Sequence, residues 1–94
     1  MRRLVWGRTF ARAYERTLRR HPELDVTMER TLQLLLDEPF HPSLETHKLK
    51  GKLAGAWACR AGYDLRIVFY FCPSDCEGEK DILLINMGSH DEVY

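Results

Sequence analysis

The chain has 94 residues, of which 45% are hydrophobic and 30% are charged. This length supports one domain, residues 1–94, and the composition is that of a folded protein rather than a disordered one. The 14 Lys and Arg residues balance the 14 Asp and Glu residues, so the formal net charge is zero. A strongly cationic nucleic-acid binder is therefore excluded at the level of total charge.

The charge is unevenly distributed along the chain. Residues 1–52 contain eleven basic and seven acidic side chains, whereas residues 53–94 contain three basic and seven acidic ones. The first twenty residues contain seven arginines and a single acid, Glu15. Such a layout can create a local surface that attracts anions although the total charge is zero.

Compartment signals are few. No apolar run is long enough for a transmembrane helix, and the basic N-terminus is not followed by the apolar stretch of a signal peptide. The three cysteines are an odd number, and Cys72 and Cys76 do not have the CxxC spacing of a metal or redox site. We therefore expect a reduced, cytoplasmic protein with no membrane contact and no metal site, in which Cys59 and Cys72 are buried free thiols.

The first half of the chain predicts a short strand and two helices. The strand covers residues 2–6, and the first helix follows with Thr9 as its N-cap. This helix should end before His21, because the residue preceding Pro22 avoids the helical region. A second helix should begin at Pro22 and end near residues 38–39. Arginines at positions 8, 12, 16 and 19 or 20 run along an exposed face of the first helix.

The second half predicts strands. Residues 39–55 are rich in Pro and Gly and indicate a loop, and strands are expected at 56–61, 65–72 and 82–87. A polar hairpin loop should span 73–81, and Gly88 should end the last strand. Because short links favour antiparallel neighbours, the element order predicts an α+β fold, with two N-terminal helices on one face of a small twisted antiparallel sheet.

Polar residues gather where these strands begin and end. Arg66 is the only charge in an apolar strand, and Asp64 lies two residues earlier on the same strand face. Antiparallel pairing of the last two strands would place residues 64–66 opposite 86–90 and so bring Asp64, Arg66 and His90 together. A loop with His47, Lys50 and Lys52 precedes the adjoining strand. Imidazoles beside cations suit phosphate binding and proton transfer at neutral pH. The simpler alternative is a solvated lysine loop and ordinary surface histidines.

Two segments carry a family resemblance. They are the H-x-L-x-G loop at residues 47–51 and the Gly-Ser-His-x-x-Val-Tyr ending at residues 88–94, with Trp57 and the strand 65–70 between them. Together they resemble the RelE/ParE superfamily of bacterial type II toxins, and within it the YafQ-like group of messenger-RNA interferases. The resemblance covers nearly the whole chain.

The resemblance implies a toxin that is neutralised by a cognate antitoxin and that cleaves messenger RNA on the ribosome, with no metal or small-molecule cofactor. Its chemistry would be attack of a 2′-hydroxyl on the adjacent phosphodiester. The matching positions assign acid–base roles to His90 and His47, and Asp64 is the only candidate for a family carboxylate. The remaining assignments are phosphate contacts by Arg66, Lys50 and Lys52, and base stacking or orientation of the nucleophile by Tyr94.

Two alternatives remain open. A ParE-like toxin would inhibit DNA gyrase without cleaving RNA, although paired histidines favour the nuclease because simple blocking does not require proton transfer. The other alternative is a weak or inactive member that acts as an antitoxin-binding module. It is favoured by Trp57 and Cys59, which are uncharged where RelE relatives carry lysines.

Overall fold

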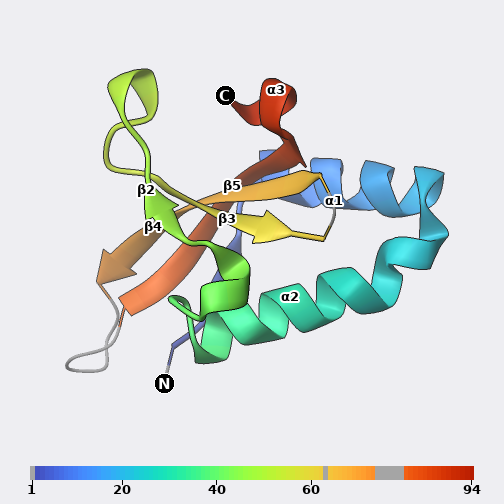
Figure 1. The fold of residues 1–94 in the computed structure, drawn as a ribbon, viewed down its shortest axis with the longest axis horizontal. Coiled ribbons are helices and arrows are strands. Elements are labelled where there is room, and N and C mark those ends of the chain that lie inside the picture. The colour runs from blue at the N-terminus through green and yellow to red at the C-terminus, as the bar shows by residue number, and fades with distance from the viewer. Residues whose placement is uncertain (1, 63, 74–79) are drawn as a thin grey trace.

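Five strands form one sheet in the order β1-β5-β4-β3-β2, and helices lie beside it (Figure 1). The computed structural model describes residues 2–62, 64–73 and 80–94. The strands are β1 (Leu4–Trp6), β2 (His47–Lys48), β3 (Trp57–Ala61), β4 (Leu65–Pro73) and β5 (Lys80–Ser89). The α-helices are α1 (Arg8–Arg20), α2 (Asp25–Asp37) and α3 (His90–Val93), and 3₁₀ turns cover η1 (Pro22–Leu24), η2 (Pro42–Leu44) and η3 (Gly51–Leu53). The predicted α+β class is confirmed.

The sheet is mixed rather than wholly antiparallel. β2, β3, β4 and β5 pair antiparallel in that order, and for β3, β4 and β5 this confirms what their short links predicted. β1 instead pairs parallel with β5, in the register Leu4 to Ile82. The physical reason is the connection: the two helices between β1 and the remaining strands are long enough to carry the chain back to the same end of the sheet.

The first helix begins two residues earlier than the sequence predicted. Gly7, rather than Thr9, occupies the N-cap, and its N–H donates to the Leu84 carbonyl at 2.9 Å. A Cβ atom at position 7 would lie 2.6 Å from the same oxygen, so only glycine allows this approach. The predicted break at His21–Pro22 is confirmed, and Pro22 opens a 3₁₀ turn before the second helix.

Later boundaries also differ from the prediction. The expected loop at 39–55 contains two 3₁₀ turns and the short strand β2, because His47 and Lys48 pair with Ala58 and Trp57. β5 continues through Gly88 to Ser89 before α3 begins. Most of the expected 73–81 loop, residues 74–79, lies outside the described residues, and Pro73 and Lys80 belong to paired strands.

One face of the sheet, the helix face, carries the hydrophobic core. β3, β4 and β5 contribute alternate residues to it, and the helices add Phe10, Met28, Leu32 and Leu35, all at most 7% exposed. The sheet residues of this core are Cys59, Ala61, Ile67, Phe69, Ile82, Leu84 and Met87. The sheet therefore holds both long helices on one side, as the sequence predicted.

The opposite face, here called the second face, carries Arg60, Arg66, Val68 and Tyr70. The loop at 49–56 and α3 stand on this side, whereas α2 runs along the other (Figure 1). A Cβ atom at Gly55 in the loop would lie 3.7 Å from the Tyr70 ring. Val68 is 3% exposed although it points away from the core, so the second face is partly covered.

The core explains why one truncation should be costly. Phe10 is fully buried against Trp6 and Tyr14, and Phe10→Ala should lower the free energy of unfolding by about 3–5 kcal/mol through lost burial and a cavity. Urea unfolding measures the change. Val26→Ala is the control, since Val26 is 56% exposed. Equal effects from the two variants would contradict this core.

A second prediction concerns pH and the pairing of β1 with β5. The Asp81 carboxylate accepts from the Arg3 guanidinium and the Arg3 N–H, both at 3.0 Å. The Arg3 side chain, through this hydrogen bond, lowers the pKa of Asp81 below its ordinary value, and the backbone hydrogen bond lowers it further. A depressed folded-state pKa stabilises the fold above the unfolded pKa, about 3.9, and this contribution is lost as pH falls through the folded pKa.

Asp81→Asn should therefore be less stable than the unaltered protein at pH 7. The gap should shrink as the pH is lowered below about 4. Chemical unfolding at a series of pH values measures it. A gap of constant size across that range would contradict the role of the carboxylate charge.

Candidate functional site

The register of β4 and β5 brings two candidate segments together. Leu65 lies opposite Ser89, and Arg66 lies opposite Gly88. His90 follows directly as the first residue of α3. The predicted juxtaposition of residues 64–66 with 86–90 is confirmed at the level of the backbone.

The short helix α3 is fixed in place by a capping box. The Ser89 hydroxyl accepts from the Glu92 N–H at 3.3 Å, and the Glu92 carboxylate accepts from the Ser89 N–H at 2.9 Å. These hydrogen bonds, the backbone one most strongly, lower the pKa of Glu92. His90 is thereby held at the start of the helix, with its ring exposed.

The last residue, Tyr94, packs against His90. The Tyr94 ring meets the His90 ring edge-on, with 4.5 Å between the ring centroids. Partial burial raises the pKa of the Tyr94 hydroxyl, and the positive charge of Arg66 opposes that shift. Tyr94 therefore contacts His90 directly, and the strand register places Arg66 opposite Gly88, two residues before His90.

His47 enters the same face from β2. It pairs with Ala58, which pairs with Val68, so the three residues share the second face by register. The His47 Nδ1 lies 2.9 Å from the Glu45 carbonyl oxygen. A carbonyl oxygen only accepts, so Nδ1 carries the proton in the neutral ring and Nε2 keeps its lone pair. That is the tautomer that a general base at Nε2 requires.

Glu45 interacts with both His47 and Arg60, and no pattern in the sequence predicted that it belongs to the site. Its backbone is left-handed, with φ of 49° and ψ of 40°, which is uncommon for a glutamate. Its carboxylate accepts from the Arg60 guanidinium at 2.9 Å. Arg60 lowers the pKa of Glu45 most, and Arg66 and His47 lower it further. Glu45 therefore lies within electrostatic reach of all three.

Two arginines stand directly across from each other on neighbouring strands. Arg60 on β3 pairs in register with Arg66 on β4, an arrangement that is repulsive for like charges. The Glu45 carboxylate compensates for it on one side. Among the described residues, Arg66 instead donates to the Leu65 carbonyl, at 3.2 Å, and forms no ion pair. Its guanidinium keeps donors for an external anion.

The predicted lysines lie at the border of this face. Lys50 and Lys52 are exposed in the loop that stands over the sheet (Figure 1). Lys48 lies elsewhere, because strand alternation turns it to the helix face, where its Nζ is 5.5 Å from the Trp57 ring centroid. Lys50 and Lys52 can therefore contact an anion at the edge of the site, and Lys48 belongs to another surface.

Asp64 is not brought to Arg66. It is exposed in the turn before β4 and lines a cavity of about 330 Å³ with Thr17 and His21 at the end of α1. Among the described residues it makes no ion pair with Arg66, contrary to the pairing that strand alternation predicted. The reason is local: β4 begins at Leu65, so Asp64 belongs to the turn and does not follow the strand's alternation.

The uncharged residues of β3 have a structural explanation. Trp57 and Cys59 both point to the helix face, and burial raises the pKa of the Cys59 thiol to about 12. A lysine at either position would face the core. The cation of β3 that lies on the second face is Arg60. Because side chains alternate along a strand, the sequence could have placed Arg60 on the face opposite Trp57 and Cys59. Burial therefore favours the protonated thiol of Cys59, whereas Cys72, which was also expected to be buried, is only half-buried.

Within the described parts of the chain, no group of His, Cys, Asp and Glu side chains is arranged to hold a metal ion. Across those same parts, no helix has the length and apolar character needed to span a membrane.

The chain matches a known family along almost its whole length. Residues 2–94 fit the family described as "Bacterial toxin of type II toxin-antitoxin system, YafQ". No curated protein matches the chain.

Several solved structures of similar fold are described as toxins. A copper-bound mutant toxin from Helicobacter pylori is 26% identical, with a TM-score of 0.72 and 100% of each chain covered. A YoeB/ParE toxin from Agrobacterium tumefaciens is 23% identical over 94% of this chain and 98% of its own, with a TM-score of 0.76. The E. coli DinJ-YafQ toxin-antitoxin complex is 15% identical over 99% and 97%, with a TM-score of 0.74. The latter two likenesses show the fold alone.

The geometry around Glu45 predicts a definite tautomer for His47. In ¹⁵N NMR spectra of the neutral imidazole, Nδ1 of His47 should be protonated and Nε2 should not. His41 is an internal control, because the Ser43 N–H donates to its Nδ1 at 3.1 Å and so requires the opposite tautomer.

Two variants test the cause. Glu45→Gly favours the left-handed backbone and should keep the His47 tautomer, whereas Glu45→Val disfavours that backbone and should give a mixture. The same mixture in both variants would show that the Glu45 side chain, not the backbone conformation, holds the ring.

Proposed function

Because the chain belongs to the YafQ family of bacterial type II toxins, we propose that it is an endoribonuclease that cleaves messenger RNA on the second face of its sheet. One observation carries the proposal: Arg66, a cation without an ion-pair partner among the described residues, lies between two histidine-bearing segments, β2 and α3. A phosphodiester held by Arg66 would have an imidazole available from each side.

The proposed reaction is attack of a ribose 2′-hydroxyl on the adjacent phosphorus. His47 accepts the hydroxyl proton at Nε2, whose lone pair is kept free by the hydrogen bond at Nδ1. Arg66 stabilises the charge that develops on the phosphate oxygens, and Lys50 and Lys52 add longer-range attraction. The P–O5′ bond breaks as His90 gives a proton to the leaving oxygen, which yields a 2′,3′-cyclic phosphate and a 5′-hydroxyl.

Two other residues complete the assignment. Tyr94, which is 43% exposed, offers a ring for stacking against an RNA base, and its contact with His90 orients the imidazole. Asp64 lies in the turn before β4 and forms no ion pair with Arg66 among the described residues, so the proposed proton transfers do not use it. The reaction as written needs no cofactor, because both proton transfers use side chains of this chain.

The proposed partners are a cognate antitoxin and messenger RNA on the ribosome. The antitoxin is proposed from the E. coli YafQ structure, which is solved as a complex with DinJ. Inducible expression of the chain should slow growth, and co-expression of the antitoxin should restore it.

Removing either imidazole should abolish the activity while the fold remains. His90→Ala and His47→Ala should each lower transcript cleavage by about 10²–10⁴-fold, the usual contribution of acid–base catalysis. Primer extension on transcripts from expressing cells measures the cleavage, and circular dichroism checks the fold. His21→Ala is the matched control, since His21 is an exposed histidine at the end of α1.

Unchanged cleavage in the His90→Ala variant would remove His90 from the mechanism. Intact transcripts combined with inhibition of purified DNA gyrase would establish the ParE-like alternative. Growth without any defect, from soluble folded protein, would favour the inactive antitoxin-binding module.

A further inference from the structure

An exposed tyrosine lies in line with Arg66 on the second face of the sheet. The core takes the alternate residues of β4, so Arg66, Val68 and Tyr70 share the opposite face. At about 3.3 Å per residue, Tyr70 lies about 13 Å from Arg66 along the strand. Tyr70 is 37% exposed, and its hydroxyl makes no hydrogen bond among the described residues. The face on which we place the reaction therefore carries an accessible aromatic ring.

The Tyr70 ring belongs to an apolar strip that crosses the sheet. Tyr70 pairs with Leu83 on β5, and Leu83 pairs with Val5 on β1, so the three side chains lie next to one another on the second face. Leu83 is half-buried, and Val5 is 44% exposed. The strip is thus open enough for a flat apolar group to lie on it.

The loop between β2 and β3 borders this strip. Figure 1 shows the loop standing on the second-face side of the sheet, and a Cβ atom at Gly55 would lie 3.7 Å from Cε1 of the Tyr70 ring. Lys50 and Lys52 are exposed in the same loop and make no ion pair among the described residues. An aromatic ring and two uncompensated cations therefore occupy one end of the second face.

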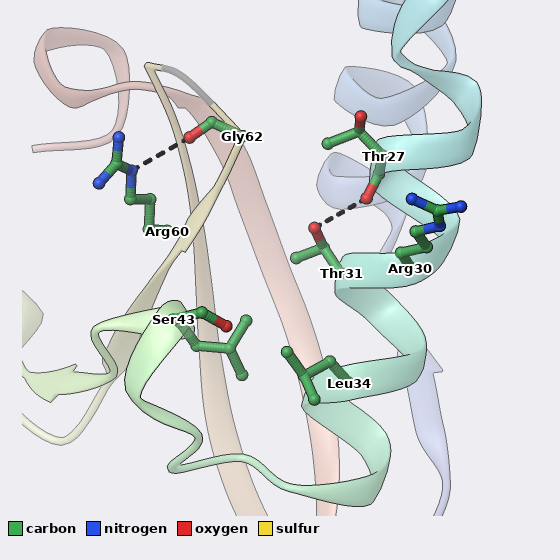
Figure 2. Close-up of a pocket in the computed structure, with 8 residues that line it drawn as sticks. Thr27, Arg30, Thr31, Leu34, Ser43, Arg60 and Gly62 are labelled. Carbon is green, nitrogen blue, oxygen red and sulfur yellow. Dashed lines mark hydrogen bonds between the residues drawn. The ribbon is translucent and has the colours of Figure 1, made fainter.

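The edge of β3 beyond Arg66 offers less to a polynucleotide. Arg60 is already engaged there, because its Nε donates to the Gly62 carbonyl at 3.1 Å and its Nη1 donates to Glu45 at 2.9 Å. Figure 2 shows the first of these bonds, and it shows the guanidinium groups of Arg30 and Arg60 directed outward from the two walls of the cleft between α2 and β3. That cleft presents no pair of cations to a phosphate, so the path along β4 to Tyr70 is favoured.

The order of groups on the second face gives the RNA a direction. In the proposed reaction His47 accepts the proton of the 2′-hydroxyl, which belongs to the nucleotide on the 5′ side of the cleaved bond. The pairing of β2, β3 and β4 places His47 in register with Val68, between Arg66 and Tyr70. His90 gives its proton to the leaving 5′ oxygen, and it begins α3 past the start of β4, at the opposite end from Tyr70. The RNA would thus run 5′ to 3′ from Tyr70 to His90.

We propose that Tyr70 is a stacking subsite for an RNA base on the 5′ side of the cleaved bond, with Lys50 and Lys52 holding the backbone beside it. The proposal rests on the proposed function and gives the substrate a direction. Aromatic rings beside positive charge bind single strands without sequence preference, because every base has a flat π-face. The subsite therefore adds affinity and fixes the position of the strand, and it takes no part in the chemical step.

Charge favours RNA over a protein segment as the occupant of this strip. Asp81 pairs in register with Cys72, two residues beyond Tyr70, and its carboxylate is neutralised by the Arg3 guanidinium at 3.0 Å. The exposed lysines of the loop are therefore the uncompensated charges at this end of the face, and they attract a phosphate backbone. Protein partners instead derive most of their affinity from anchors in fully desolvated pockets.

The test measures cleavage of messages on programmed ribosomes by the purified whole chain. Tyr70→Ala should raise the protein concentration that gives half the maximal rate by about tenfold and leave the maximal rate within about twofold, because one stacked base is lost. Tyr70→Phe should restore the unaltered value, since it keeps the ring. Phe40→Ala is the matched control, because Phe40 is 61% exposed and its ring contacts Trp57 and Phe71, which point to the helix face.

Messages that lack bases locate the subsite. Removing the two bases upstream of the cut should abolish the difference between Tyr70→Ala and the unaltered protein, because no base is left to stack on the ring. Removing the two bases downstream should leave that difference intact. The reverse pattern, an equal loss with every message, or weakened binding of the cognate antitoxin with unchanged cleavage would each overturn the subsite.

A second measurement does not depend on cleavage. A 2′-O-methyl hexanucleotide lacks the attacking hydroxyl, and its addition to the whole chain should shift the NMR signals of the Tyr70 ring protons and give contacts between the ring and base protons. Cleavage by the unaltered protein without these shifts would overturn the subsite and leave the nuclease. The shifts without any cleavage would keep Tyr70 as an RNA contact and overturn the nuclease assignment, and the absence of both would overturn both.

Discussion

Both the hydrophobic core and the candidate site depend on the antiparallel register of β4 and β5. It places Arg66 opposite Gly88, two residues before α3 begins at His90. It also brings Ile67 and Met87 into the core together. A slip by one residue would exchange the two faces, bury a guanidinium and expose the apolar residues. The same pairing that forms the core therefore places the cation of the site.

Gly88 shows how closely the core and the site are connected. A Cβ atom there would lie 3.0 Å from the Cβ of Glu92, so a larger residue would push α3 away from the sheet. Glu92 in turn closes the capping box that fixes His90. The glycine is thus needed for close packing at the point where the strand becomes a helix, and not as the end of the strand.

The second constraint is electrostatic. Arg60 and Arg66 lie opposite each other on adjacent strands. Glu45, whose backbone is left-handed, supplies the carboxylate that reduces the repulsion between them. The same residue offers its carbonyl to His47. Glu45 thus meets the His47 ring with its carbonyl and Arg60 with its carboxylate, while Arg66 forms no ion pair among the described residues. Zero net charge is consistent with such a site, because field strength depends on where the charges lie.

Sequence reasoning succeeded where alternation and short links determine the structure. The α+β class, the break at His21–Pro22 and the approach of Arg66 to the segment containing His90 all follow from those rules. It failed where a single residue departs from them. Asp64 lies in a turn rather than in the strand, and the conformation of Glu45 is one that glutamate rarely adopts. The strand β2 has only two residues, too few for a periodic pattern.

The central claim is that the imidazoles of His47 and His90 cleave RNA by transfer of protons around a phosphate held by Arg66. The chemical identity of the RNA ends tests it most directly. Mass spectrometry of fragments cut by the purified protein on programmed ribosomes should find 2′,3′-cyclic phosphates and 5′-hydroxyls. Fragments with 5′-phosphates and 3′-hydroxyls would contradict the account, because they require water rather than the ribose hydroxyl as the nucleophile.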